Sequence, residues 1–373
     1  MSKSAIVIGA GIVGLATARA LAVRGYRVTV FERSERAVGA SVRNFGMVWP
    51  IGQPVGPLYD RALKSKSIWK ESLGEAGLWH EEVGSLHVLY EKDEVEFAEE
   101  LVDQRQDSNI RMLTREETLA KSPAVNPENL KGALWSATEM IVDPREAIAG
   151  LPAYLNRRFG VQFVWKTMIH RIDHPNVYSG SQSWSADEIY VCSGADFETL
   201  YPEEFAIAPL TKCKLQMMRL ESQPDQWRIG PALCGSLSFI HYDSFKAPSR
   251  QAALKKRFEE EYGEYIRWGI HVMASQNGSG EITIGDSHEY GHTFDPFDKS
   301  YINELIIRYL QRFANFKSMR LIQSWHGIYA KTTSGQTEIV LRPEDGVTII
   351  NGLGGAGMTL SFGLCDEIIS SQM

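Results

Sequence analysis

Residues 1–33 alternate between apolar runs and glycines in an order that predicts a strand, a turn, a helix and a second strand. Ala5-Ile6-Val7-Ile8 is a short apolar run, residues 12–24 carry helical periodicity, and Val28-Thr29-Val30-Phe31 is a second apolar run. Gly25 suits the position that follows the end of a helix. A strand, a helix and a strand within about 30 residues form a βαβ unit, which favours a parallel sheet.

The rest of the chain mixes helical and strand patterns. They predict helices over residues 59–73, 91–106, 144–158 and 299–313, and strands over residues 86–90, 161–165 and 188–192. Between residues 207 and 285 most patterns are those of strands, at 214–220, 237–242, 269–274 and 281–285, with a hairpin turn at Gly278-Ser279-Gly280. Residues 347–373 again predict a strand, a glycine turn and a helix.

This order predicts an α/β (α+β) fold with two domains, each built from separated segments. We expect residues 1–80, 145–205 and 320–373 to form a Rossmann-like nucleotide-binding domain. Residues 81–144 and 206–319 are expected to form a mainly antiparallel β-sheet domain that binds the substrate. A nucleotide-binding domain interrupted by a second sheet explains why α/β patterns lie at both ends of the chain.

Composition and charge exclude several classes of protein. The 373 residues include 39 basic and 46 acidic side chains, and this net charge of −7 argues against a general nucleic-acid binder. The four cysteines lie far apart, so we expect neither a disulfide framework nor a Cys-rich zinc site, and a reducing, cytoplasmic location fits. His241 and His271 are isolated and no H-x-x-x-H occurs, so no metal site is expected. No apolar run reaches the roughly 20 residues of a transmembrane helix, and no secretory signal pattern is present.

The first glycine cluster predicts a dinucleotide site. Gly9-Ala10-Gly11-Ile12-Val13-Gly14 matches G-x-G-x-x-G, follows a strand and opens a helix, and Glu32 ends the next strand. Gly9 permits the tight turn, Gly11 lets the backbone approach a pyrophosphate, and Gly14 lets the helix and strand pack closely. The carboxylate of Glu32 suits ribose hydroxyls and repels a 2′-phosphate, so FAD or NAD is favoured over NADP.

A second glycine cluster at the other end of the chain favours FAD. Asn351-Gly352-Leu353-Gly354-Gly355-Ala356-Gly357-Met358-Thr359 lies between a strand and the final helix. A helix N-terminus aimed at the pyrimidine edge of a flavin stabilises the negative charge of the reduced ring. A nicotinamide enzyme does not usually need this second element.

Two further segments complete the expected cofactor site. Residues 39–47 offer donors and a close backbone approach, and the strand 189–192 ends in small residues. The residues that we expect to bind FAD are Gly9, Gly11, Ile12, Val13, Gly14, Glu32, Arg33, Ser41, Arg43, Asn44, Phe45, Gly46, Met47, Ile169, Ser193, Gly194, Gly327, Gly352, Leu353, Gly354, Gly355, Ala356, Gly357, Met358 and Thr359.

These motifs, in this order, resemble those of the D-amino-acid oxidase superfamily, which includes glycine oxidase and sarcosine oxidase. The resemblance covers nearly the full length and implies a Rossmann-like FAD domain, a substrate domain whose sheet covers the flavin, and hydride removal from a carbon beside an amine nitrogen. Residues 41–50 further resemble a subgroup associated with phosphonate catabolism. That likeness implies oxidative deamination of 2-aminoethylphosphonate or an N-alkyl derivative to phosphonoacetaldehyde.

The chain also departs from the family. The family often has an Arg that binds the substrate carboxylate within a Trp-x-Gly-x-Arg-Pro motif, and Tyr329 stands at that position here. An ordinary α-amino acid is therefore a doubtful substrate, because Tyr cannot replace a bidentate guanidinium. Lys331 or Arg43 would suit a differently placed anion. Thr283 stands where sarcosine oxidases use Lys, and their covalent flavin Cys has no counterpart, so we expect non-covalent FAD.

Amine oxidation by a flavin requires a neutral amine, and His is the side chain best suited to manage its proton near neutral pH. His271, predicted to lie on a strand, His326 and His288 are the candidates, and Tyr329 and Lys331 are expected to face the substrate. Trp49, Tyr242 and Trp268 are candidates for the pocket wall.

Three functions remain open from the sequence. The first is an FAD-dependent amine oxidase or dehydrogenase that passes electrons to oxygen, a quinone or another carrier. The second is a dehydrogenase of a small hydroxy acid or polyol phosphate on the same fold, which needs a general base for the alcohol proton. The third is a flavin-binding or flavin-free protein without turnover.

Overall fold

The computed structural model describes residues 2–246 and 248–372. A six-stranded sheet forms the first half of the molecule, in the order β20-β21-β13-β1-β2-β9. Its strands β1 (Ser4–Ile8), β2 (Arg27–Phe31), β9 (Gln162–Val164), β13 (Glu188–Val191) and β21 (Val347–Asn351) run parallel, and β20 (Ile339–Leu341) is antiparallel to β21. The expected βαβ unit, β1-α1-β2, is therefore present.

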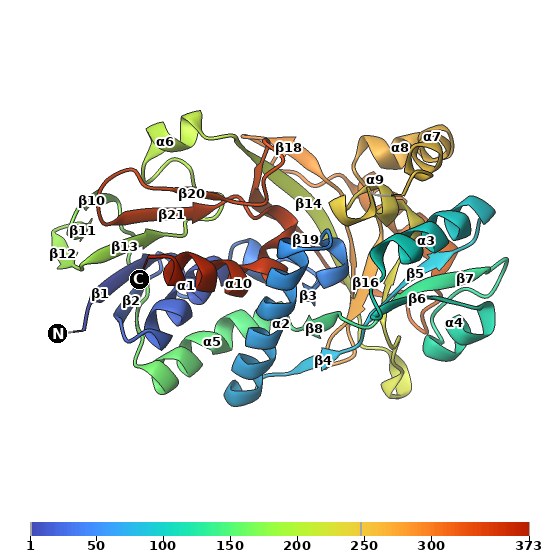
Figure 1. Cartoon of the computed structure of the whole chain (residues 1–373), viewed down its shortest axis with the longest axis horizontal. Helices are drawn as coiled ribbons and strands as arrows, with labels where there is room; N and C mark the ends of the chain where they lie inside the picture. Colours follow the sequence, from blue (N-terminus) through green and yellow to red (C-terminus); the bar gives the residue numbers. More distant parts are fainter. Residues whose placement is uncertain (1, 247, 373) are drawn as a thin grey trace.

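Alternate residues of β1 belong to different cores. Ala5 and Val7 pack with the helices α1 (Ile12–Val23), α2 (Pro57–Ala76), α5 (Pro144–Phe159) and α10 (Gly357–Ser370), which lie on one side of the sheet (Figure 1). Ile6 and Ile8 pack on the other side, together with Val177 of the small sheet β10 (Arg171–Asp173), β11 (Asn176–Ser179) and β12 (Gln182–Ser185). A strand whose two faces are both covered has apolar side chains at successive positions, as the sequence of β1 does.

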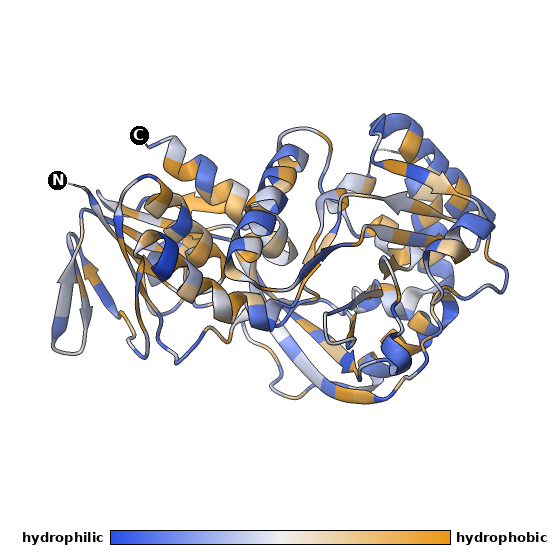
Figure 2. Ribbon diagram, turned by 90° about the horizontal axis from the view of Figure 1, so that it is seen from below, coloured by the Kyte–Doolittle hydropathy of each residue, from blue (hydrophilic) through white to orange (hydrophobic). Residues whose placement is uncertain are grey.

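The second half is a nine-stranded, mainly antiparallel sheet in the order β18-β14-β17-β16-β15-β5-β7-β6, with β19 paired to β14. Only β15 and β5 are parallel neighbours within it. The strands are β5 (Ser85–Leu89), β6 (Ile110–Leu113), β7 (Gly132–Ser136), β14 (Leu210–Leu220), β15 (Ala232–Cys234), β16 (Met273–Gln276), β17 (Ile282–Gly285), β18 (Glu289–Gly291) and β19 (Leu321–Thr332). The helices of this half are α3 (Lys92–Arg105), α4 (Arg115–Lys121), α7 (Gln251–Glu261), α8 (Gly263–Arg267) and α9 (Ser300–Phe313). Figure 2 shows how apolar residues concentrate in the strands of both large sheets.

A small sheet joins the two halves. It contains β3 (Met47–Val48), β8 (Met140–Val142) and β4 (His80–Glu82). Outside this sheet, the short helix α6 (Pro202–Ile207) precedes β14. The mixed α/β fold with a parallel Rossmann-like sheet and a mainly antiparallel sheet confirms the expected fold class. In the described part of the chain, no helix has the length and apolar character needed to cross a bilayer.

Local predictions were wrong mainly between residues 236 and 272. The strand predicted at 237–242 is a 3-10 helix at Ser236–Ile240, and residues 269–272 form a loop before β16. The helices α7 and α8 were missed because α7 buries only Leu254 and Phe258, which is a weak periodic signal in an otherwise polar segment. The long strand β19 was also missed, since its first four residues are exposed and give no buried alternation.

Candidate active site

One cavity of about 1350 Å³ runs from the glycine turn after β1 to the inner face of the second sheet. Drug-sized ligands occupy pockets of roughly 300–1,000 Å³, so this cavity has room for a longer molecule. The starts of α1 and α10, the loop 37–47, the ends of β2 and β13, and β19 all contribute to its wall. Segments from both ends of the chain therefore enclose a single space.

The glycine turn after β1 requires glycine at two positions. Gly9 has φ of +105°, and a Cβ there would lie 2.4 Å from the carbonyl oxygen of Cys192. A Cβ on Gly14 would lie 1.8 Å from the carbonyl oxygen of Gly9. Gly14 does not line the cavity; it allows α1 to approach β1 closely. The roles predicted for Gly9, a tight turn, and for Gly14, close packing of the helix against the strand, agree with this geometry.

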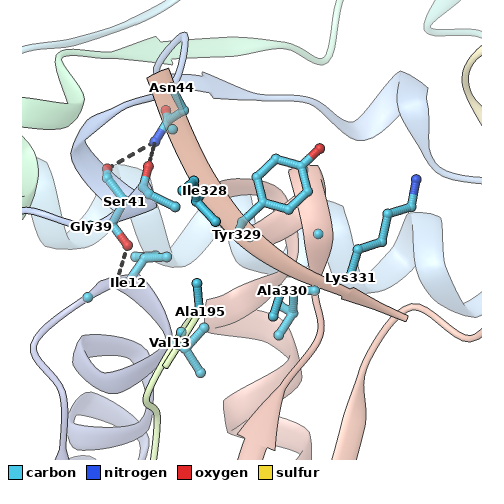
Figure 3. A pocket seen from close by; sticks show the side chains of 18 of the residues that line it. Ile12, Val13, Gly39, Ser41, Asn44, Ala195, Ile328, Tyr329, Ala330 and Lys331 are labelled. Atoms are coloured by element: carbon cyan, nitrogen blue, oxygen red, sulfur yellow. Dashed lines mark hydrogen bonds between the residues drawn. The ribbon is translucent and has the colours of Figure 1, made fainter. Parts of the chain in front are cut away.

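The first turns of α1 and α10 both lie at the cavity wall and contain no acidic residue. No side chain of the N-cap residues Gly11 and Ala356 accepts a backbone hydrogen bond. The Ile12 N–H donates to the hydroxyl of Ser41 at 2.9 Å, which places a polar side chain at the start of α1 (Figure 3). Helix N-termini that carry partial positive charge and free N–H groups favour anionic ligands such as a pyrophosphate.

Glu32 lies at the end of β2 on the same cavity. Its carboxylate accepts hydrogen bonds from the N–H groups of Ala10 and Ser34, each at 3.0 Å, so its position is fixed relative to the glycine turn. Carboxylate oxygens have further lone pairs that can accept hydrogen bonds from ribose hydroxyls. Arg33, the next residue, also lines the cavity and forms an ion pair with Asp196.

Asn44 holds the loop between β2 and β3 in shape. Its amide donates to the carbonyl groups of Ala40 and Ser41, and its side-chain oxygen accepts from the Gly46 N–H at 2.8 Å (Figure 3). Gly46 has φ of +74° and lies against the Val142 carbonyl, so it supports the loop and does not line the cavity. Apart from Gly14 and Gly46, every residue expected to bind FAD lines this cavity.

Several buried polar atoms of the cavity wall have no hydrogen-bond partner within the described part of the chain. Among them are the hydroxyl oxygen of Ser193, two residues after β13, and the indole nitrogen of Trp49. Buried polar groups are nearly always paired in proteins, so unpaired ones on a cavity wall indicate a ligand. Together with the two helix N-termini, the glycine turn and Glu32, these donors and acceptors fit FAD.

Strand β19 supplies the wall opposite the glycine turn. Tyr329, Lys331 and His326 all line the cavity, and Tyr329 lies across from Cys213 of β14 in the strand register. A Cβ on Gly355 would lie 3.5 Å from the Tyr329 hydroxyl, which places this phenol beside the start of α10 (Figure 3). His326 Nδ1 lies 2.9 Å from Asp298, and the His326 carbonyl accepts a hydrogen bond from Arg43.

A cluster of three histidines and one aspartate forms the deep end of the cavity. His241, His271, His288 and Asp286 all line it. The ring centroids of His241 and His271 are 3.7 Å apart, and those of His271 and His288 are 5.2 Å apart. The sequence interpretation that His241 and His271 are isolated is therefore wrong, because the loops before β16 and after the 3-10 helix at 236–240 meet in space.

The structure also corrects the setting of the other candidates. His271 lies in a loop, not on a strand, and is nevertheless buried at the cavity. Trp268 does not line the cavity; its ring packs against Tyr301, whereas Trp49 and Tyr242 do form part of the wall. Thr283 also lies away from the wall and accepts a hydrogen bond from Arg219. Sequence reasoning missed Asp286, and only its place directly after a predicted strand could have indicated it.

A family model described as "FAD dependent oxidoreductase" (DAO) matches residues 4–370, almost the whole chain. The chain belongs to this family. Membership confirms the expected oxidoreductase class and the FAD cofactor, and it sets aside the non-catalytic alternative. It does not support the narrower likeness to the phosphonate-associated subgroup.

Known proteins similar to this member of the DAO family support the same grouping. A glycine oxidase from Pseudomonas aeruginosa is 48% identical over 59 residues, which are 16% of this chain and 14% of the relative. A D-amino acid dehydrogenase from Helicobacter pylori is 25% identical over 253 residues, which are 52% of this chain and 61% of the relative. Each match therefore spans less than two thirds of the length of the relative. The crystal structure of a glycine oxidase from Geobacillus kaustophilus has a TM-score of 0.75 at 18% identity and covers 99% of this chain and 94% of its own, which shows a shared fold.

Proposed function

We propose that the protein oxidises the C–N bond of a small primary or secondary amine to an imine, which water then hydrolyses. The observation that carries this proposal is the single cavity, which joins the glycine turn after β1, the start of α10 and the polar side chains of β19. FAD, when bound, would accept the hydride, which carries both electrons of the C–H bond. The residues of this chain bind and orient the amine, exclude water and remove its proton.

The proposed FAD site uses the residues expected from the sequence. Gly9, Gly11 and the start of α1 would hold the pyrophosphate, Glu32 the ribose, and the start of α10 the electron-rich edge of the flavin. FAD would be held non-covalently. Cys192 is the cysteine that lines the cavity in the described part of the chain, and burial raises the pKa of its thiol to about 12, so it is a poor nucleophile.

Two cations at the cavity support a substrate that carries an anionic group. Within residues 2–246 and 248–372, neither Arg43 nor Lys331 forms an ion pair with a carboxylate. Lys331 Nζ lies 3.3 Å from the hydroxyl of Tyr290, and the guanidinium of Arg43 donates to the His326 carbonyl at 3.2 Å. Tyr329 stands at the position where related enzymes often have Arg. A substrate whose anionic group lies near Lys331 and Arg43 is therefore favoured over an ordinary α-amino acid, whose carboxylate would need an Arg at position 329.

The narrower proposal names this anion as a phosphonate. The substrate would be 2-aminoethylphosphonate or an N-alkyl derivative, and the product phosphonoacetaldehyde with ammonia or an alkylamine. Lys331 would bind the phosphonate, Tyr329 would donate a hydrogen bond to the substrate, and His326 with Asp298 would hold the Arg43 side of the pocket in place. His271, the first of the histidine candidates, would contact the amine whose proton has to be removed before oxidation.

A panel of compounds tests this proposal under anaerobic conditions. The FAD-loaded protein is mixed with glycine, sarcosine, D-alanine, 2-aminoethylphosphonate and its N-methyl derivative, and the flavin absorbance is followed. We expect bleaching by an amine that carries an anionic group, fastest with the phosphonates. Bleaching by hydroxy analogues alone would favour the second candidate, a dehydrogenase of a small hydroxy acid or polyol phosphate. The neutral imidazoles of the deep cluster favour that alternative because they can accept an alcohol proton.

The acceptor of the electrons is tested separately. Oxygen uptake during turnover identifies an oxidase, and reduction of a quinone analogue without oxygen uptake identifies a dehydrogenase. The two outcomes do not change the first half-reaction, in which the amine is oxidised.

A further inference from the structure

Asp286 is a buried carboxyl group that lacks the partners such a group normally has. It directly follows β17 and is 6% exposed. Its Oδ1 lies 3.5 Å from Nε2 of His271, and its Oδ2 lies 3.8 Å from Nε2 of His288. Among the residues that the structure describes, neither Oδ1 of Asp286 nor the buried Nδ1 of His271 has a hydrogen-bond partner. A buried carboxylate without a donor is costly, so these atoms indicate a ligand that brings hydrogen-bond donors.

The imidazoles around Asp286 supply acceptors and no fixed positive charge. Burial lowers the pKa of His288 to about 4, and burial together with the neighbouring imidazoles and Lys331 lowers the pKa values of His241 and His271 well below the usual range. Nδ1 of His288 lies 2.9 Å from the Gly269 carbonyl, so it donates there and leaves Nε2 as an acceptor toward the cavity. At neutral pH the cluster therefore suits a cation with N–H groups and not an anion.

Three histidines can also hold a metal ion, and their nitrogen atoms here lie within 4.8 Å of one another. The rings of His241 and His271, however, are tilted by 37° to each other with centroids only 3.7 Å apart. Ligands of one zinc ion radiate from it at about 2.0–2.1 Å and place the ring centres about 5 Å apart. The close approach of these two rings therefore favours a ligand that lies beside them.

We propose that Asp286, with His271 and His288, forms the subsite that binds the amine nitrogen of the substrate, an inference that rests on the proposed function. The substrate enters as an ammonium ion, its N–H groups donate to the Asp286 carboxylate and the two imidazoles, and one proton moves to Asp286. The neutral amine then loses a hydride from the neighbouring carbon to the cofactor, and its nitrogen lone pair forms the C=N bond. The proton on Asp286 returns to water when the product leaves.

The surroundings of Asp286 make it a stronger base than an exposed carboxylate. Burial raises its pKa well above the usual range. The titratable groups that act on it or share its end of the cavity are His241 and Tyr242 from the loop after residue 240, His271, His288, Cys213 of β14, Tyr290 of β18, and Tyr329 and Lys331 of β19. Of these groups Lys331 is the one that carries positive charge at neutral pH, and it would bind the opposite, anionic end of the substrate.

The test compares Asp286→Asn with Asp243→Asn in the FAD-loaded protein. Asp243→Asn is the control, because it makes the same change of charge at the cavity rim. The Asp243 side chain is 62% exposed there and pairs with Lys246. Anaerobic stopped-flow measurement gives the rate of flavin reduction by the best amine of the panel from pH 7 to pH 10. We expect D286N to be at least 100-fold slower than the wild type at pH 7 and to recover toward it as the pH approaches the amine's own pKa. D243N should stay within threefold at every pH.

Each other result has a distinct meaning. Equal rates for D286N and the wild type at pH 7, or an equal loss at every pH, would overturn the assignment. Stoichiometric zinc in the purified protein that depends on His241, His271 and His288 would overturn it as well. If D286N does not retain FAD, His271→Gln replaces it, with an expected tenfold weaker binding of the amine and unchanged binding of the hydroxy analogue. A wild-type protein that no amine reduces contradicts the proposed function itself.

Discussion

Gly357, at the start of α10, lies directly against Ile12, at the start of α1. A Cβ on Gly357 would be 3.8 Å from Cγ2 of Ile12. The two helices run side by side, and the hydroxyl of Thr17 on α1 lies 3.3 Å from the Cys365 thiol on α10. Two helix N-termini thus open into one cavity although they lie at opposite ends of the chain, which is the arrangement an extended, charged cofactor needs.

The glycine turn predicts a severe effect of Gly14→Ala. The added methyl would lie 1.8 Å from the Gly9 carbonyl oxygen, so α1 has to move away from β1 and its first N–H groups leave their positions. We expect FAD affinity to fall at least tenfold and stability to fall by about 1–3 kcal/mol, as for overpacking in a core. Gly74→Ala is the control, because a Cβ there meets nothing within 4 Å and α2 should gain stability. Flavin fluorescence and thermal melting measure both effects, and unchanged FAD affinity in G14A would contradict this description.

The hydrogen bonds of Glu32 predict a loss of affinity for FAD and a small loss of stability in Glu32→Gln, because the amide nitrogen cannot accept one of the two backbone hydrogen bonds that the carboxylate accepts. In Glu32→Gln the amide keeps the size of the side chain but loses charge-assisted hydrogen bonds to ribose, each worth about 1.5–3 kcal/mol. The dissociation constant of FAD should rise about tenfold or more, as measured by titrating the apoprotein. Glu35→Gln is the matched control, because this side chain is 76% exposed and pairs with Lys166 on the surface. Equal affinities of the two variants would show that Glu32 does not contact the cofactor.

Removing the charge of Lys331 should weaken substrate binding and leave the rate of the chemical step unchanged. Lys331→Met keeps the aliphatic stem and removes the charge, so KM for an amine with an anionic group should rise about tenfold while kcat stays within a factor of two. Amines without an anionic group should bind equally well to the variant and the wild type. Lys255→Gln, an exposed lysine that faces Glu259 on α7, serves as the control. A fall in kcat with unchanged KM would assign Lys331 a different role.

The burial of His87 predicts how the free energy of unfolding depends on pH. It is fully buried, its ring packs against Phe239 and Phe245, and its two ring nitrogens have no hydrogen-bond partner in residues 2–246 and 248–372. Burial lowers its pKa to about 3, so the folded protein keeps it neutral while the unfolded chain protonates it below pH 6.5. Its contribution to stability is lost as the pH falls through this window, by about 2 kcal/mol between pH 6.5 and pH 5. His87→Leu should reduce this loss in urea unfolding, and an identical slope in both proteins would contradict the prediction.

The glycine turns, Glu32 and the separated halves were predictable because each depends on local pattern. A βαβ unit, an uncapped helix start and an alternation of polar and apolar residues leave signals within about 30 residues. The assignment of residues 1–80, 145–205 and 320–373 to a cofactor domain, and of 81–144 and 206–319 to a substrate domain, remains a proposal about where the two halves divide.

The deep cluster was not predictable, because it forms only when three loops meet. His241, His271 and Asp286 follow or precede short elements whose own patterns were misleading, and nothing in their spacing indicates contact. The close contact of the His241 and His271 rings and the unpaired, buried oxygen of Asp286 arise from tertiary packing. The pairing of β19 with β14, which brings Tyr329 and Lys331 to the cavity, does so as well.

The central claim is that one cavity holds FAD at one end and an amine at the other. Its most direct test is anaerobic addition of 2-aminoethylphosphonate, its N-methyl derivative and the other amines of the panel to the purified, FAD-loaded protein. At least one amine should remove the flavin absorbance band within a stoichiometric titration and yield the matching aldehyde or keto acid. A protein whose flavin stays oxidised with every amine, or that binds no FAD, would contradict it.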